Sequence, residues 1–219
     1  MDEIGLNSLK IEINGVLSLA CSAPNGIGKE QDEVNRLKKE FPDVFTDSLG
    51  CYKGTPIQLK FDESKNPIHL RARPIPFALQ GKVEEELDKL VKQGVLEPVQ
   101  SSDWCTPIVV SFKSNGKIRI CGDYKSTLNK AIYEDIYPIP PVSQLLAKVS
   151  QGNYFAKLDL AQAYQQLQVD EKSALAQTII THKGAFKVKR LQFGISSAPA
   201  IFQRFIENLL SGMPNVIPY

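Results

Sequence analysis

The sequence has few of the residues that build metal-binding or disulfide-rich folds. Its 219 residues include only four cysteines and two histidines. The cysteines are scattered and form no C-x-x-C pair, and the histidines do not complete a zinc-binding spacing. These absences exclude a zinc ribbon or zinc finger. The cysteines lie at positions 21, 51, 105 and 121.

Export and membrane signals are also missing from the sequence. The chain begins Met-Asp-Glu, without a basic start followed by an apolar run, so a signal peptide is not indicated. The apolar run Val16–Ala20 is too short to span a bilayer. We therefore expect an intracellular protein with reduced thiols and no membrane partner, rather than one with two disulfides.

The net charge is small, but charged residues are unevenly distributed along the chain. The formal net charge is +2, and 42% of the residues are hydrophobic, which is enough for a buried core. Residues 1–109 hold 13 Lys and Arg against 17 Asp and Glu, whereas residues 110–219 hold 13 against 7. A basic second half is typical of a phosphate-binding surface, although chance asymmetry is the alternative.

Periodicity divides the chain into a linker-like start and a folded remainder. Residues 1–75 carry weak alternation, a short charged helix and an extended Arg-Ala-Arg-Pro-Ile-Pro stretch, whereas regular apolar spacing begins near residue 78. Ser114-Asn-Gly116 indicates one hairpin turn and Lys183-Gly184 a second. Ser197 is expected to cap a helix whose apolar face is buried. The expected helices are 78–93, a second one opened by Pro140-Pro141 with apolar residues at 142, 145, 146 and 149 on one side, and the segment after 197. The expected strands are 108–112, 117–121, 154–160, 178–180 and 186–190.

Several ordered motifs carry the chemistry. Tyr154–Leu160 predicts a strand that delivers Asp159 to its end, with Tyr164 five residues later. Before it lies Cys-Gly-Asp-Tyr-Lys-Ser-Thr-Leu-Asn at 121–129, and after it Phe-Gly-Ile-Ser-Ser-Ala-Pro-Ala-Ile-Phe-Gln-Arg at 193–204. The sequence closes with Val-Ile-Pro-Tyr at 216–219.

Together these motifs resemble the reverse transcriptase of gypsy-type LTR retrotransposon Pol polyproteins. The resemblance implies an α+β fold: right-hand polymerase fingers and palm, with an antiparallel palm sheet backed by helices. It makes residues 1–75 the linker between protease and reverse transcriptase, and 76–219 the fingers and partial palm. The family's Y-x-D-D motif would begin at Tyr219, so the palm would be incomplete and the thumb would lie beyond it. A strand starting near Val216 is expected beside the Asp159 strand.

By this resemblance Asp159 is the first of three catalytic carboxylates. Nucleotide addition uses two divalent ions, Mg²⁺ or Mn²⁺, held by carboxylates and substrate phosphates. With only Asp159 of the three present, the isolated chain is expected to be inactive. Without the resemblance, Asp159 is a solvent-facing residue at a strand end.

The resemblance also implies a site for deoxynucleoside triphosphates. Lys113 and Arg119 on the hairpin would contact the phosphates, as guanidinium and ammonium groups suit them. Tyr164 would exclude a 2′-hydroxyl, and Phe193 and Gly194 would form the floor. The alternatives are a solvated hairpin tip for Lys113 and a core tyrosine for Tyr164.

Four further residues would face an RNA or DNA template-primer: Asp123, Lys125, Pro199 and Gln203. Lys125 replaces the usual arginine, Gly122 the usual apolar residue and Gln192 the usual proline of the family. Lysine lacks the bidentate fork of arginine, so template contact at Lys125 is expected to be weaker. The alternatives are a surface ion pair between Asp123 and Lys125 and an ordinary apolar helix face after residue 197.

The chain is thus expected to act with the remainder of the Pol polyprotein, in a cytoplasmic particle or the nucleus. A non-catalytic nucleic-acid-binding remnant and a decayed element stay as the alternatives. The nucleotide sequence that follows codon 219 separates them, because an in-frame Asp-Asp would restore the metal site.

Overall fold

The computed structural model describes residues 8–13, 17–22, 27–42, 48–112, 116–149, 156–214 and 216–218. The chain forms two compact units. One unit joins Met1–Gly50 to Pro141–Ala163, and the other joins Cys51–Pro140 to Tyr164–Tyr219. This grouping follows contacts in space, and the linker boundary after residue 75 stays a prediction. No described helix is long and apolar enough to cross a bilayer.

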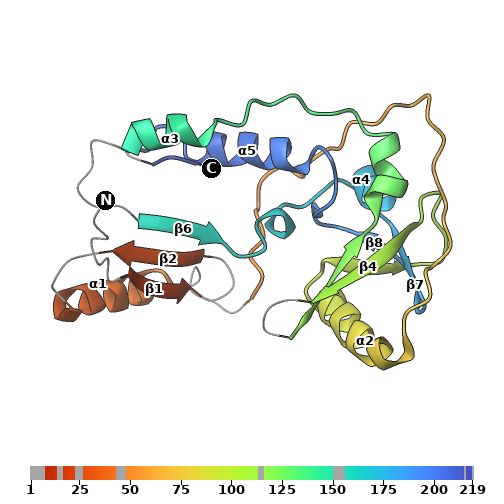
Figure 1. The fold of residues 1–219 in the computed structure, drawn as a ribbon, viewed down its shortest axis with the longest axis horizontal. Coiled ribbons are helices and arrows are strands. Elements are labelled where there is room, and N and C mark those ends of the chain that lie inside the picture. The colour runs from red at the N-terminus through yellow and green to blue at the C-terminus, as the bar shows by residue number, and fades with distance from the viewer. Residues whose placement is uncertain are drawn as a thin grey trace. The chain divides into compact units, whose positions relative to one another are not determined.

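The first unit contains a three-stranded antiparallel sheet in the order β1-β2-β6 (Figure 1). Asp159 lies on β6, where its backbone is opposite Ser18 of β2. The N-terminal segment therefore supplies the neighbour of the strand that carries Asp159. The elements of this unit are β1 (Ser8–Ile13), β2 (Leu17–Ser22), α1 (Ile27–Glu40), α3 (Val142–Val149) and β6 (Ala156–Leu160).

The second unit is built on a five-stranded sheet in the order β3-β8-β7-β4-β5. β4 and β7 pair in parallel, and the other neighbours are antiparallel. Both hairpins expected from the sequence are present, as β4–β5 and β7–β8. The strands are β3 (Leu96–Val99), β4 (Thr106–Phe112), β5 (Ile118–Gly122), β7 (Ile179–Thr181) and β8 (Gly184–Val188).

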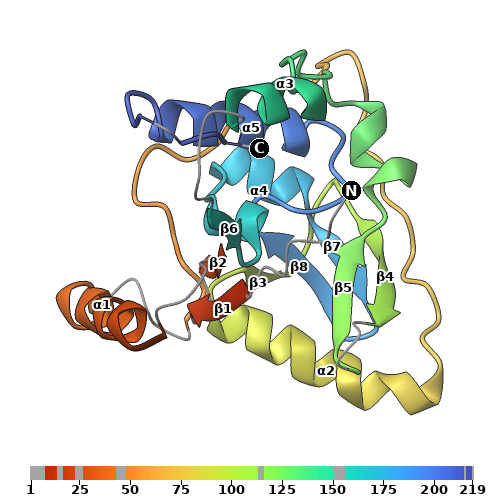
Figure 2. The same ribbon diagram turned by 60° about the vertical axis from the view of Figure 1, so that its left-hand side comes forward.

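Helix α2 (Phe77–Lys92) covers this sheet from edge to edge. It contacts both edge strands, β3 and β5, and Figure 2 shows it running along the sheet. Val83, Leu87 and Leu90 recur at helical spacing and are buried beneath it. Gly94 has a φ of +67°, the left-handed geometry that glycine adopts at helix ends. The predicted helix at 78–93 is confirmed.

Residues 51–62 lie across the second unit as a strap. The amide of Ile57 donates to the Gln168 carbonyl at 2.8 Å, and its carbonyl accepts from the Asp170 amide at 3.0 Å. The amide of Leu59 donates to the buried Ser173 hydroxyl at 2.9 Å. These bonds fix part of the expected linker onto helix α4 (Glu171–Ala176) and the segment before it.

Helix α5 (Ala198–Leu209) follows the Phe193-Gly194 turn and differs from expectation at two points. Ser197 precedes it but makes no capping hydrogen bond, because its backbone is already helical and its hydroxyl is buried without a partner in the described part of the chain. The apolar face is only partly buried: Ala198, Ala200 and Gln203 are the buried positions, whereas the larger apolar residues are partly exposed, Leu209 most of all at 50%.

The strand expected near Val216 is also absent from the described positions 216–218. The carbonyl of Pro218 instead accepts a hydrogen bond from the Gln203 side chain at 3.3 Å. Two prolines among the last six residues, at 214 and 218, restrict ladder formation, because proline has no amide hydrogen.

Candidate nucleotide and template interface

Arg119 reaches the nucleotide candidates from the β4–β5 hairpin. It pairs with Ser111 in the antiparallel register and is exposed. Its guanidinium carbon lies 5.5 Å from the centre of the Phe193 ring, a cation–π distance. The charged end of the hairpin is thereby held next to the turn before α5. Lys113, the other hairpin candidate, lies outside the described residues.

Tyr164 completes this cluster. Its ring centre is 4.6 Å from that of Phe193 and 5.3 Å from that of Phe202, in tilted and edge-to-face arrangements. Partial burial raises the pKa of the Tyr164 hydroxyl. The structure thus brings together three residues that are far apart in sequence, Arg119, Tyr164 and Phe193. We call these three residues the aromatic–arginine cluster.

The aromatic contacts continue along α5 to the strap. The ring centres of Phe202 and Phe205 are 6.0 Å apart, and Tyr52 meets Phe205 edge-on at 4.8 Å. The sequence pattern predicts only that Phe202 lies on the apolar face of a helix, and it gives no signal at Tyr52. The helical spacing of 202 and 205 was visible in the sequence, but the contact with residue 52 depends on the path of the strap.

Gly194 and Gly122 are glycines for different reasons. Gly194 has a φ of +90°, which residues with a Cβ rarely adopt. A Cβ on Gly122 would lie 2.6 Å from the Tyr124 ring, which is 1% exposed and cannot move aside. The hydroxyl of Tyr124 donates to the Gln177 carbonyl at 3.0 Å, and burial raises its pKa. Glycine at 122 therefore leaves the space that the Tyr124 ring occupies.

The template-side candidates occupy different environments. Asp123 is ion-paired with Arg73 rather than with Lys125, so the surface pair considered above is not formed. Lys125 and Pro199 are exposed, whereas Gln203 is 5% exposed. The Gln203 amide donates to Glu207 at 2.7 Å and to the Pro218 carbonyl. Arg73 was not found from the sequence, since its only signal was a basic residue in an extended proline-rich stretch.

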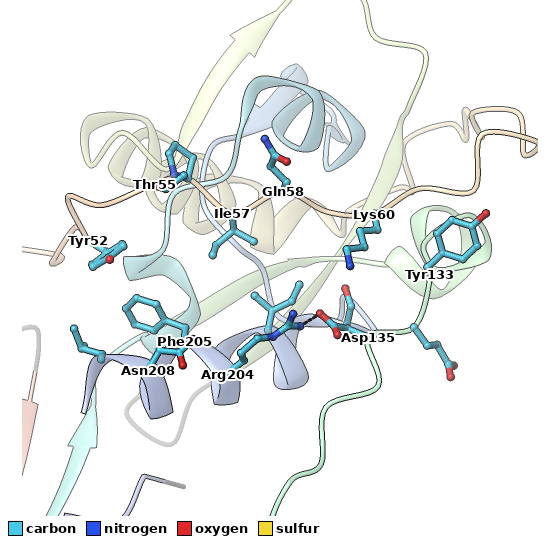
Figure 3. A pocket seen from close by; sticks show the side chains of 15 residues that line it. Tyr52, Thr55, Ile57, Gln58, Lys60, Tyr133, Asp135, Arg204, Phe205 and Asn208 are labelled. Carbon is cyan, nitrogen blue, oxygen red and sulfur yellow. Dashed lines mark hydrogen bonds and ion pairs between the residues drawn. The ribbon is translucent and has the colours of Figure 1, made fainter. Parts of the chain in front are cut away.

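A groove of about 760 Å³ opens between the strap, residues 133–135 and α5. None of the predicted site residues lines it. Figure 3 shows the side chain of Arg204 meeting Asp135 across the groove, where the two form an ion pair. Phe205 lines the groove and also contacts Phe202, so the groove and the aromatic contacts share one face of α5.

The described residues contain no cluster of metal-ligating side chains. Asp159 lies on β6, and its side chain is outside the described features. In the part of the chain that the structure describes, no three His, Cys, Asp or Glu side chains gather into a metal-binding group. Since a pair of divalent ions needs at least two carboxylates, the described residues do not fit a two-ion site by themselves.

Comparison with known proteins assigns this arrangement to a family. A family model described as reverse transcriptase (RNA-dependent DNA polymerase) matches residues 112–217. An uncharacterized protein of Caenorhabditis elegans is 36% identical over 89% of the chain and 16% of its own length. The retrovirus-related Pol polyprotein from transposon opus of Drosophila melanogaster is 33% identical over 88% of the chain and 19% of its own length.

A solved structure agrees in fold. The foamy viral protease–reverse transcriptase in complex with double-stranded DNA superposes with a TM-score of 0.75, at 22% identity, over 89% of this chain and 34% of that chain. The α+β fold expected for fingers and part of a palm is thus confirmed. The chain spans 16% and 19% of the two curated relatives. Residues 112–217 belong to the reverse transcriptase family and correspond to the reverse transcriptase domain of retrotransposon Pol polyproteins.

Proposed function

We propose that the chain forms the fingers and part of the palm of a gypsy-type retrotransposon reverse transcriptase, which holds a deoxynucleoside triphosphate against a template-primer. The aromatic–arginine cluster supports this proposal most directly. It joins a cation suited to phosphates, an aromatic ring suited to reading a sugar, and the floor residue Phe193. The three residues come from three separate sequence motifs.

In this proposal Arg119 binds the triphosphate and Tyr164 lies beneath the sugar, where its ring leaves no space for a 2′-hydroxyl. Phe193 and Gly194 support the nucleotide. Lys113 adds a second cation to the phosphates. The partial burial of Tyr164 and its two ring contacts restrict its movement, as discrimination between sugars requires.

The template-primer lies on the opposite side of the nucleotide. Asp123, Lys125 and Pro199 are accessible to it, at least in part. Gln203 takes part only if its bonds to Glu207 and Pro218 open. RNA or DNA as the partner is supported by the basic second half of the chain and by the foamy viral relative, whose structure holds double-stranded DNA.

Asp159 contributes one carboxylate to a site for two Mg²⁺ or Mn²⁺ ions, and the family pattern places the other two after the position of Tyr219. When bound, such ions align the attacking and leaving oxygens. Because residues 1–219 hold only one of these ligands, we route no chemical step through the ions. Binding and orienting the nucleotide and template are the tasks of the residues present here, with the remainder of the Pol polyprotein, in a cytoplasmic particle or the nucleus.

A polymerase assay tests the catalytic part of the proposal. The 219-residue polypeptide should not extend a primed template with Mg²⁺ or Mn²⁺. A polypeptide lengthened to include the Asp pair should extend it, and Asp159→Asn should abolish that activity. Extension by residues 1–219 that Asp159→Ala abolishes would contradict the ligand count.

An incorporation experiment tests the role of Tyr164 in nucleotide selection. In the lengthened enzyme, Tyr164→Ala should raise incorporation of ribonucleotides relative to deoxynucleotides, whereas Tyr164→Phe, which keeps the ring, should not. An unchanged ratio in Tyr164→Ala would leave Tyr164 as a packing residue.

A non-catalytic nucleic-acid-binding role is the second candidate, and the excess of Lys and Arg in residues 110–219 favours it. Such a protein would bind single- and double-stranded nucleic acid with a steep salt dependence and no dependence on deoxynucleotides. Binding that dATP does not affect, together with a genuine stop codon after position 219, would support this second role.

A further inference from the structure

The Phe193-Gly194 turn is held by one side chain that no assigned role covers. The Asn129 side-chain amide donates to the Gly194 carbonyl at 2.8 Å. Its side-chain oxygen accepts from the Ser196 amide at 3.0 Å. A single carboxamide thus bridges both sides of the turn, using its donor and its acceptor at once.

Packed residues around Asn129 hold its backbone in place. It lies in the 3-10 turn Leu128–Lys130, between Leu128 at 0% exposure and Ala131 at 2%. Just before it, the hydroxyls of Thr127 and Thr106 are 2.6 Å apart in the buried core. Because its neighbours are packed, Asn129 presents its amide from a fixed position.

The turn lies near Gly122 and Tyr124. A Cβ added to Gly194 would lie 3.5 Å from the Gly122 carbonyl and 3.8 Å from the Tyr124 ring. The two hydrogen bonds from Asn129 are therefore the side-chain contacts that hold the turn directly. Its next residue, Ile195, is 2% exposed and anchors it in the core.

We propose that Asn129 is a positioning residue that fixes the Phe193-Gly194 turn and thereby sets the Phe193 ring against Tyr164 and Arg119. Phe193 is the only member of the aromatic–arginine cluster adjacent in sequence to the clamped glycine. Its ring is the contact that Arg119 and Tyr164 share. Loosening the turn therefore disturbs the phosphate-binding cation and the sugar-reading ring together. For nucleotide selection, the inference rests on the function proposed above.

Amide hydrogen exchange in the 219-residue chain tests the clamp without any ligand. Asn129→Ala removes the acceptor of the Ser196 amide, so exchange at Ser196 should accelerate on the order of tenfold. Asn129→Asp keeps an acceptor for Ser196 but sets a carboxylate against the Gly194 carbonyl, so Ser196 protection should survive. The matched control is Asn208→Ala, at an exposed asparagine on α5. Unchanged Ser196 exchange in Asn129→Ala would overturn the clamp.

Nucleotide selection in the lengthened enzyme supplies the readout that a purely structural role would not move. The readout is the ratio of dATP to ATP incorporation, measured at temperatures where all variants are folded. Asn129→Ala should lower this ratio about tenfold, and Asn129→Asp should lower it several-fold. Asn208→Ala should not. Faster Ser196 exchange with an unchanged preference would refute the link to Phe193. If the wild-type enzyme shows no preference, the proposed function fails, while exchange at Ser196 still decides the clamp.

Discussion

Helices α2 and α5 are both amphipathic, but only the apolar stripe of α2 is buried. Leu87 of α2 is 0% exposed, whereas Leu209 of α5 is 50% exposed. A sheet of five strands covers the first stripe, and the second faces a groove. Helical periodicity therefore predicts which residues share a face. Whether that face is buried depends on elements elsewhere in the chain.

The two helices are also held by different forces. Apolar burial dominates beneath α2, where Val83, Leu87 and Leu90 are packed. Helix α5 fully buries only small or polar residues. Arg204 pairs with Asp135, and Tyr137 donates to Glu207. The partly buried rings of Phe202 and Phe205 add apolar contacts. We therefore expect truncation of an apolar side chain to cost more on α2 than on α5.

The largest effect should come from Leu87→Ala. Removing a fully buried leucine leaves a cavity and should lower the free energy of unfolding by about 2–5 kcal/mol. Leu209→Ala, the matched change on α5, should lower it by less than about 1 kcal/mol, because half of that side chain is already exposed. Urea denaturation followed by circular dichroism measures both. Equal losses would mean that the α5 stripe is covered in solution.

Phe205→Ala should have an intermediate effect. Phe205 is half-buried and contacts the rings of Tyr52 and Phe202, so we expect a loss of about 2 kcal/mol, below the 3–5 kcal/mol typical of a buried phenylalanine. Phe205→Leu keeps most apolar contact and should lose only the ring pairing, about 0.5–1.5 kcal/mol. Similar losses in the two variants would show that ring geometry, rather than volume, holds the strap to α5.

Asp135→Asn should have a smaller effect that depends on salt. It removes the charge that Arg204 meets across the groove, in a pair whose side chains are 38% and 20% exposed. Such partly exposed pairs contribute up to about 1 kcal/mol. The difference from wild type should shrink when denaturation is repeated in 1 M NaCl, since salt screens exposed charges. A difference independent of salt would point to the hydrogen bond instead of the charge.

Much of the second unit was predictable because its signals are local. Buried spacing in α2 and the turn chemistry around Gly116 and Gly184 predicted the helix and both hairpins. Other predictions failed. Ser197 does not cap α5, because its own backbone is already helical. The described residues 216–218 form no strand, and the prolines at 214 and 218 restrict pairing there. Only the exposure of the α5 stripe depends on distant segments.

The candidate site divides in the same way. The resemblance to the family identified Arg119, Tyr164 and Phe193. Their ring and cation–π contacts place the three residues together but test no single role. Arg73 and the Asn129 bridge were missed as functional features, because each acts across 50 or more positions of sequence. Residue type alone does not reveal such a partner; the fold must bring it near.

The smallest effect we expect is a contrast in pH dependence between the two regions. Glu97 on β3, next to α2, accepts hydrogen bonds from Lys187 and Lys189, which lower its pKa. The pKa of Lys187 is raised, first by its bond to Glu171 and then by Glu97. Beside α5, the bond to Glu207 raises the pKa of Tyr137. All of these groups are near the surface, so the shifts in stability are small.

The two limbs of a stability profile should therefore respond to different variants. The contribution of Glu97 is complete above its ordinary pKa of 4.5 and is lost as pH falls through the lowered folded-state pKa, so Glu97→Gln should flatten the acid limb. Hydrogen bonds from Ser64 lower the pKa of Asp62, so Asp62 contributes to the loss of stability in acid in every variant. The contribution of Tyr137 is complete below 10.0 and is lost as pH rises through its raised pKa, so Tyr137→Phe should reduce the alkaline limb. Lys187, Tyr164 and Tyr124 also have raised pKa values and act in the same direction. An alkaline limb unchanged in Tyr137→Phe would assign it to these three groups and remove the contrast between the helices.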